Sequence, residues 1–427
     1  MKTQLKFVSS VIPIKGRFMN IALITYDISP FRGSEASVSW NFVTQMSRHV
    51  RLTVIYGSQD NEIEHYIKTH HIDNVEWIAV PKKDVGRFGR GLRQDYYFSL
   101  YYRQWHREAA DIVRRLADSG SIDLIHYLNP IGFKEPGWCW ENKNVPYVWG
   151  PVQGVDNRPL KLCKALGIKG TVFAVVRRIV HNGLFMYYPR VRKAFRRADA
   201  IFAATPATVR GLKRHHHRDA LYLPENGITA METDTPVTFA PNDTFRMIWI
   251  GGLDVDRKAI GIVLDALLQL KHTNWHIDIF GDGTPSTINA RKISDLGSRI
   301  TLHGKVDREI VQRHMRESHL HIISSLGEAT TTVLFEAMAK AVPTMTLDHC
   351  GMAGVVCHRC GIKIPIATYG NVTSRMALEI DRLIDTPDRV AELSRGVLEC
   401  SKRFMWANRI DTFLDTYQRL TAQYATR

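Results

Sequence analysis

Short apolar runs alternate with helical patterns along most of this 427-residue chain. The runs NIALITY (20–26), IDLIHYL (122–128) and RMIWIGGL (246–253) are typical of buried strands, and amphipathic stretches separate runs of this kind. Strands that alternate with helices form parallel sheets covered on both faces. We therefore expect an α/β protein, and the length of the chain allows two doubly wound domains.

One stretch interrupts this alternation. The sequence TAMETDTPVTFAPNDTF is rich in Thr, Pro and Asp and has no periodicity, so we place a linker at 230–243. It separates an N-terminal domain (19–229) from a C-terminal domain (244–399), and an amphipathic pattern predicts a last helix within 400–427. Residues 1–18 precede the first strand and are expected to be a disordered leader. Ligands of such folds bind at the carboxyl ends of the strands, here in the cleft between the domains.

The net charge of +15 is concentrated in one region. Residues 161–218 contain fourteen Lys and Arg against one acid, Asp199, with apolar residues interspersed among them. Such a region suits an anionic membrane surface, nucleic acid or an acidic substrate, whereas the plainest interpretation is a solvated basic face over a core. We favour the membrane surface over nucleic acid, because the sequence has no recognisable nucleic-acid-binding motif.

Hydropathy and cysteine content indicate the cellular compartment in which the protein is expected. Every apolar run is shorter than the roughly 18–20 residues that span a bilayer. Six cysteines do not make a disulfide framework in a chain of this length. We expect a cytoplasmic protein that associates peripherally with the inner face of the cytoplasmic membrane.

Two glutamates flank a predicted strand-turn-helix junction. The strand LHIISSLGE ends at Glu328, the helix is expected to begin near Thr331 and Thr332, and Glu336 lies within that helix. Backbone N–H groups at a helix start form an anion site, and carboxylates on either side can bind sugar hydroxyls. The spacing alone is common on surface helices, but in this context it predicts a seat for a sugar, a diphosphate and a ribose.

At this point the sequence resembles family 4 glycosyltransferases of the GT-B fold. The resemblance rests on GEATTTVLFEAMAKAVPTMTLDHCGMAG (327–354), IFGDG (279–283) and PENGI (224–228), and weaker matches extend it from Met19 to the last helix. It implies two Rossmann-like domains that face each other across a cleft, with a C-terminal helix crossing back. The N-terminal domain would bind the acceptor and the C-terminal domain the nucleotide sugar.

The resemblance also implies the reaction. Family members are retaining, metal-independent hexosyltransferases without a cofactor, and their co-substrate here would be a UDP- or GDP-linked sugar. The partner would be a glycan or lipid-linked acceptor in the biosynthesis of a cell-envelope polysaccharide, such as lipopolysaccharide or exopolysaccharide. No nucleic acid is expected as a partner.

Residue roles follow from the same resemblance. Glu328 would contact the donor sugar, Glu336 the ribose, and the amides of Thr331 and Thr332 the diphosphate. Lys258 would also bind the diphosphate. Arg257 would replace the family's usual phosphate-binding arginine, and Gly281 is the glycine of the strand-end turn. His126 would lie near the reacting sugar, and Gly33 is a glycine of the first loop.

Several of these assignments have plainer alternatives. His126 could be a hydrogen-bonded core residue, and the loop at Gly33 could serve only to cap a helix through Ser34. The sequence departs from the family where Ala329, Thr331 and Ala341 replace common glycines. Ala and Thr can adopt helical angles, so we expect these replacements to be tolerated.

Two motifs suggest metals, although we predict no metal site. Asp254 to Asp256 form an Asp-x-Asp, which binds a divalent ion in GT-A glycosyltransferases and elsewhere marks a polar turn. Cys357 and Cys360, with His349 and Cys350 nearby, could suggest zinc, but a zinc site needs a suitably spaced second ligand pair. Unlinked thiols at a helix-to-strand junction are the expected outcome.

Two other functions stay open at this stage. A nucleotide-sugar epimerase of the same fold would convert the donor in the absence of an acceptor. A basic RNA-binding protein would bind RNA with strong salt dependence and would have no affinity for nucleotide sugars.

Overall fold

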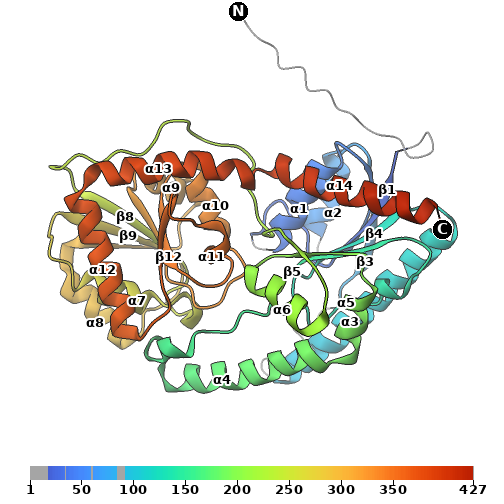
Figure 1. The fold of residues 1–427 in the computed structure, drawn as a ribbon, viewed down its shortest axis with the longest axis horizontal. Helices are drawn as coiled ribbons and strands as arrows, with labels where there is room; N and C mark the ends of the chain where they lie inside the picture. Colours follow the sequence, from blue (N-terminus) through green and yellow to red (C-terminus); the bar gives the residue numbers. More distant parts are fainter. Residues whose placement is uncertain (1–17, 34, 59–60, 84–91, 427) are drawn as a thin grey trace, which may run out of the picture.

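The computed structural model describes residues 18–33, 35–58, 61–83 and 92–426. The predicted leader lies almost entirely outside these ranges. The described chain forms two α/β units, one built on a seven-stranded sheet and the other on a six-stranded sheet. Figure 1 shows the two units side by side.

The N-terminal sheet has the strand order β3-β2-β1-β4-β5-β6-β7, and all its pairings are parallel. Its central strands are buried along their whole length because helices cover both faces. The strands are β1 (Asn20–Thr25), β2 (Arg51–Ser58), β3 (Val75–Pro81), β4 (Leu124–Asn129), β5 (Tyr147–Val152), β6 (Ala200–Ala203) and β7 (Leu221–Tyr222). The helices are α1 (Glu35–Met46), α2 (Asn61–Thr69), α3 (Leu92–Asp118), α4 (Cys163–Tyr187), α5 (Pro189–Arg197) and α6 (Pro206–His216).

The C-terminal sheet has the order β10-β9-β8-β11-β12-β13 and is also parallel. Its strands are β8 (Phe245–Ile250), β9 (Trp275–Phe280), β10 (Ile300–Gly304), β11 (Leu320–Ile323), β12 (Thr344–Leu347) and β13 (Gly361–Ile364). Its helices are α7 (Ile260–Leu267), α8 (Thr287–Leu296), α9 (Arg308–Arg316), α10 (Thr332–Ala339), α11 (Met352–Val355), α12 (Tyr369–Asp385) and α13 (Pro387–Ser401). The expected α/β class with two Rossmann-like domains is thus confirmed.

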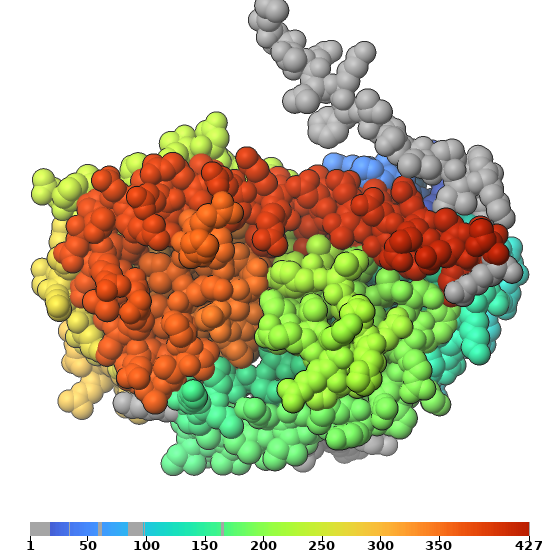
Figure 2. Space-filling view, in the orientation of Figure 1, coloured from blue at the N-terminus to red at the C-terminus, as the bar shows by residue number. Residues whose placement is uncertain are grey.

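The chain crosses between the domains twice, and the two crossings contact each other. Ile228 on the first crossing and Met405 on the second form a parallel bridge, in which the Ile228 N–H donates to the Phe404 carbonyl at 2.8 Å. After the second crossing, α14 (Trp406–Ala425) returns to the N-terminal domain, where Phe413 and Tyr417 join its core. Figure 2 shows α13 and α14 as one continuous band over both domains.

Helix α4 also contacts both domains. Leu166 and Ala174 belong to the hydrophobic core of the C-terminal domain, whereas Phe185 belongs to that of the N-terminal domain. Gly167 has a φ of 62°, outside the helical region, so the helix is kinked near its start. Figure 1 shows α4 along the lower edge of the molecule, reaching from one domain to the other. None of the described helices is long and apolar enough to cross a membrane.

The structure adds elements that the sequence patterns did not reveal. Helix α2 and strand β3 lie at the edge of the N-terminal sheet, where β3 is only partly buried and so lacks a continuous apolar run. Helix α3 begins at Leu92 and contains 27 residues. The indole N–H of Trp105 on α3 donates to the Val80 carbonyl of β3 at 2.9 Å, which fixes the helix on this edge.

Candidate functional site

A cavity of about 630 Å³ lies between the two domains. Its walls come from the start of α1, the segment after β5, α4, the first interdomain crossing, η4 (Asp256–Lys258) and the start of α10. The carboxyl ends of β5, β8 and β11 lead directly into these segments, so the cavity occupies the position that parallel sheets favour for ligands.

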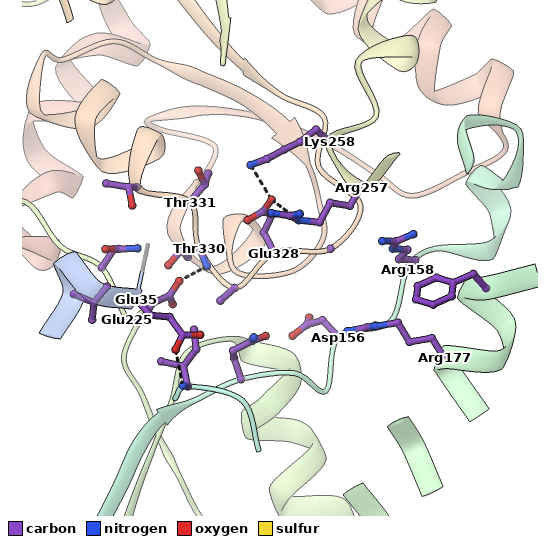
Figure 3. A pocket seen from close by; sticks show the side chains of 18 residues that line it. Glu35, Asp156, Arg158, Arg177, Glu225, Arg257, Lys258, Glu328, Thr330 and Thr331 are labelled. Carbon is purple, nitrogen blue, oxygen red and sulfur yellow. Dashed lines mark hydrogen bonds and ion pairs between the residues drawn. The ribbon is translucent and has the colours of Figure 1, made fainter. Parts of the chain in front are cut away.

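Glu328 is paired with two cations at the wall of this cavity. Its Oε1 lies 2.8 Å from Lys258 Nζ and 3.2 Å from Arg257 Nε (Figure 3). Backbone contacts hold the two segments together, because the Leu326 N–H donates to the Arg257 carbonyl at 2.7 Å and Ser324 Oγ donates to the Lys258 carbonyl at 2.6 Å. The structure therefore brings together three of the predicted residues, and Arg257 lies beside Lys258 as the replacement for the usual arginine requires.

The start of α10 forms the adjacent wall. Thr331 is the residue before the first helical turn, Thr332 begins the helix, and both line the cavity. The Thr331 side chain does not cap the helix, so the first turn brings the positive end of its dipole to the cavity. This is the arrangement that an anionic group requires.

Glu225 is a site residue that the sequence analysis missed. Its Oε1 accepts a hydrogen bond from the Thr330 N–H at 2.6 Å, while the Glu225 carbonyl accepts one from Arg409 Nη2 of α14 at 3.3 Å. Burial raises the pKa of Glu225 to about 7. Its position within the PENGI turn was the available signal, but only the fold places that turn against the start of α10.

Glu35 lines this cavity and a second one of about 670 Å³ within the N-terminal domain. Burial raises the pKa of Glu35 to about 7, even though the Ile131 N–H donates to its Oε2 at 3.4 Å. Gln153 and Arg177 are also shared by the two cavities. Gly33, which was expected to approach the donor or the acceptor, lines only the second cavity.

Two further arginines extend the positive wall. Arg177 comes from α4 and Arg158 from the segment after β5, and in Figure 3 both lie on the side of the cavity opposite Glu35. The Arg158 guanidinium lies 5.7 Å from the centre of the Phe173 ring. Arg177 belongs to the basic region 161–218, which was expected to face a membrane surface, but it lies at the cavity.

The proposed position of His126 near a reacting sugar does not agree with the structure. His126 is completely buried in β4, where its Nε2 contacts the Gly150 carbonyl at 2.6 Å and its Nδ1 contacts the Tyr417 hydroxyl at 2.6 Å. Burial lowers its pKa to about 4, so the ring is neutral. His126 joins α14 to the core, which is the alternative that its strand context allowed.

Two other predicted residues also lie outside the cavity lining. The Glu336 carboxylate accepts hydrogen bonds from Arg308 Nη2 at 2.7 Å and Gln312 Nε2 at 2.9 Å, both on α9. Gly281 has a φ of 140°, and a Cβ there would lie 1.9 Å from the Gly251 carbonyl oxygen. Gly281 thus allows the ends of β8 and β9 to approach closely, and the ribose contact of Glu336 stays a prediction.

The structure also bears on the Asp-x-Asp motif and on one residue that departs from the family pattern. Neither Asp254 nor Asp256 of the motif lines the cavity. Ala341 has a φ of 58°, in the left-handed region. The expectation that alanine is tolerated there through helical angles is therefore wrong, because this position demands the conformation that glycine adopts most readily.

The comparisons with known proteins agree with this geometry. Residues 244–386 match the family model described as Glycosyl transferases group 1. The chain is 27% identical over 113 residues to a D-inositol 3-phosphate glycosyltransferase of Gordonia bronchialis, and the match covers 26% of the chain and 24% of that protein. The matched part therefore spans about a quarter of the length of this curated relative.

Over nearly its whole length, the fold of the chain is similar to that of several solved structures. The apo form of the lipopolysaccharide outer core galactosyltransferase WaaB superposes with a TM-score of 0.64 at 14% identity, covering 93% of this chain and 98% of that one. Anabaena HepE, solved with UDP and glucose, gives a TM-score of 0.59 at 16% identity, with coverages of 94% and 100%. Residues 244–386 are thus a glycosyl transferases group 1 domain, and the chain as a whole has the GT-B fold of two facing Rossmann-like domains.

Proposed function

We propose that this protein is a retaining, metal-independent glycosyltransferase of family 4 that moves a hexose from a UDP- or GDP-linked donor to a glycan or lipid-linked acceptor. The observation that carries the proposal is the pairing of Glu328 with Lys258 and Arg257 beside the start of α10, inside the cavity between the domains. A carboxylate, two cations and a helix start are the groups that a sugar diphosphate requires.

The chemistry of transfer follows from charge. When the bond between the sugar and the diphosphate breaks, negative charge grows on the leaving phosphate. Lys258, Arg257 and the first turn of α10 stabilise this charge in a cavity from which domain closure removes water. In a front-face reaction the leaving phosphate accepts the acceptor proton, and Glu328 holds hydroxyl groups of the donor sugar.

The second cavity is the proposed acceptor site. It adjoins the first through Glu35, Gln153 and Arg177, so an acceptor hydroxyl at this boundary can reach a sugar in the first cavity. Glu35 lines both cavities, and we assign it the positioning of the acceptor hydroxyl.

The exposed face of α4 supports an acceptor that is presented at a membrane. Most of the large apolar side chains that α4 exposes repeat at helical spacing, as Ile168, Val172, Val176 and Ile179 do. The sequence from 163 to 187 contains Lys and Arg but no Asp or Glu. A helix with an exposed apolar face and basic residues lies in the interface of an anionic membrane, and we propose that α4 docks the enzyme at the inner face of the cytoplasmic membrane, in a pathway of cell-envelope polysaccharide synthesis.

A donor panel tests the proposal. The full chain is mixed with UDP-, GDP- and ADP-sugars, and one donor at a hundred times its dissociation constant should add roughly 2.7 kcal/mol of stability. That donor should then release its nucleoside diphosphate only when an acceptor extract is added. Glu328→Gln should abolish release, whereas Glu309→Gln on the exposed face of α9 should leave it unchanged.

Other outcomes would contradict the proposal. Conversion of the donor into an isomer without any acceptor would identify an epimerase. Tight, salt-sensitive RNA binding without any donor binding would identify an RNA-binding protein.

A further inference from the structure

Three thiols from two distant segments meet outside the interdomain cavity. Cys357 and Cys360 belong to the turn before β13, and Cys400 lies near the end of α13. Cys357 Sγ is 3.4 Å from Cys400 Sγ and 3.5 Å from Cys360 Sγ, and all three sulfur atoms lie within 4.8 Å of one another. Cys360 and Cys400 are buried and Cys357 is half-buried.

This set differs from the one that the sequence suggested. His349 and Cys350, the expected neighbours of Cys357 and Cys360, face a different cavity, near Asp156. Cys400 is forty residues from Cys360 in the sequence and supplies the third sulfur. The second segment thus supplies one ligand rather than the ligand pair that the sequence analysis required, and the set has three sulfur atoms.

The turn directs hydrogen-bond donors at the sulfur atoms. The Cys357 N–H donates to Cys360 Sγ at 3.2 Å. A backbone N–H that points at a sulfur atom favours the thiolate, which is the form that binds a metal.

The sulfur spacing suits a metal better than a disulfide. A tetrahedral zinc ion with bonds of about 2.3 Å holds its sulfur ligands roughly 3.8 Å apart, close to the separations of Cys357 Sγ from Cys400 Sγ and Cys360 Sγ. A disulfide requires sulfur atoms about 2.05 Å apart and would leave the third thiol without a partner. Cys-x2-Cys is also a ligand spacing common in structural zinc sites.

We propose that Cys357, Cys360 and Cys400 bind one zinc ion, which joins the end of α13 to the turn before β13. Solvent reaches the half-buried Cys357, so water supplies the fourth ligand. Cys400 directly precedes the second interdomain crossing, where Phe404 accepts the hydrogen bond from Ile228. The zinc ion therefore stabilises the segment from which this crossing begins.

Cobalt substitution tests the site in the full chain. The reduced protein is freed of metal with a chelator and titrated with Co²⁺, and we expect thiolate-to-cobalt charge-transfer absorption that saturates at about one ion per chain and disappears when Zn²⁺ is added. Cys400→Ser should weaken Co²⁺ binding by more than the roughly 10–100-fold that loss of an outer-shell partner costs. Cys163→Ser, which removes a thiol on α4 away from the cluster, should bind Co²⁺ as the unchanged protein does.

A thermal measurement covers the possibility that Cys400→Ser does not fold. Chelator should lower the Tm of the unchanged protein but not that of Cys357→Ser, whose replaced side chain is only half-buried. Absence of charge-transfer absorption, equal Co²⁺ uptake by the cluster variants, or a disulfide among these cysteines in place of metal uptake would overturn the proposal.

Discussion

Lys258 Nζ and Glu328 Oε1 lie 2.8 Å apart, so the carboxylate that we assign to the donor sugar also orients the cation that we assign to its diphosphate. The two side chains come from the segments after β8 and β11, which are neighbours in the C-terminal sheet. Neighbouring parallel strands therefore bring the sugar-binding and phosphate-binding groups to one point.

The first prediction is that the enzyme loses turnover when the Lys258 side chain is removed. Lys258→Ala should lower kcat by about 10²–10³, the usual cost of removing one group that stabilises transition-state charge. Arg257 still contacts Glu328, so the Tm should change little. Steady-state rates of nucleoside diphosphate release, with Lys305→Ala on an exposed position as the control, measure the effect, and a kcat equal to that of the control would remove Lys258 from the reaction.

The second prediction concerns the pH dependence of the reaction. Burial raises the pKa of Glu35 to about 7, and we expect its ionised form to accept the hydrogen bond of the acceptor hydroxyl. The value of kcat/KM should then rise between about pH 6 and about pH 8. Glu35→Gln should be slower and should lack this rise, and an unchanged pH profile in the variant would show that another group titrates.

The third prediction concerns stability. Burial raises the pKa of Glu225 from its ordinary value of 4.5 to about 7. A carboxyl group whose pKa is raised by folding stabilises the folded state when the pH is below the pKa that the group has in the unfolded chain. This contribution is lost as the pH rises through about 7. At pH 8 the buried charge should cost up to roughly 3 kcal/mol.

The substitution Glu225→Gln tests whether ionisation of Glu225 destabilises the folded state, as predicted. The amide keeps an oxygen for the Thr330 N–H and carries no charge, so the variant should match the unchanged protein at pH 5 and exceed its Tm at pH 8. Glu317→Gln, at an exposed position, should show no such difference between the two pH values. A variant that is less stable at pH 8 would show that the ionised carboxylate is favourable in the fold.

The fourth prediction concerns the membrane. The double variant Val176→Ser/Ile179→Ser should lose flotation with vesicles that contain anionic lipid, because it removes two side chains from the exposed apolar face of α4. Ile288→Ser, which removes an equally exposed side chain on α8, should float normally. High salt should weaken the binding of the unchanged protein, and equal flotation of both variants would exclude α4 as the docking surface.

The sequence predicted those features that short segments determine. Two alternating series predicted the α/β class, and the strand-turn-helix motif predicted the start of α10 correctly, although β11 ends at Ile323 and not at Glu328. Both depend on contacts between residues close in the chain or on motifs with strong patterns. Lys258 and Arg257 followed from the resemblance to family 4 glycosyltransferases, which have a basic pair after the first strand of the second domain.

Features that depend on tertiary contacts were missed or misplaced. Glu225 and Arg177 reach the cavity only because the interdomain crossing and α4 fold over it. His126 lies within an apolar run, a position that fits either a site or a core, and only the return of α14 decides between them. The cluster at Cys400 likewise forms only when α13 packs beside β13.

The return of α14 has a consequence for biosynthesis. Phe413 and Tyr417 complete a core whose other members, such as Phe42 and Phe202, are translated some two hundred residues or more earlier. The first half of the chain therefore emerges from the ribosome with an apolar surface that its own residues do not cover. This surface stays open until the whole second domain has been made, so the nascent chain should depend on a chaperone during that interval.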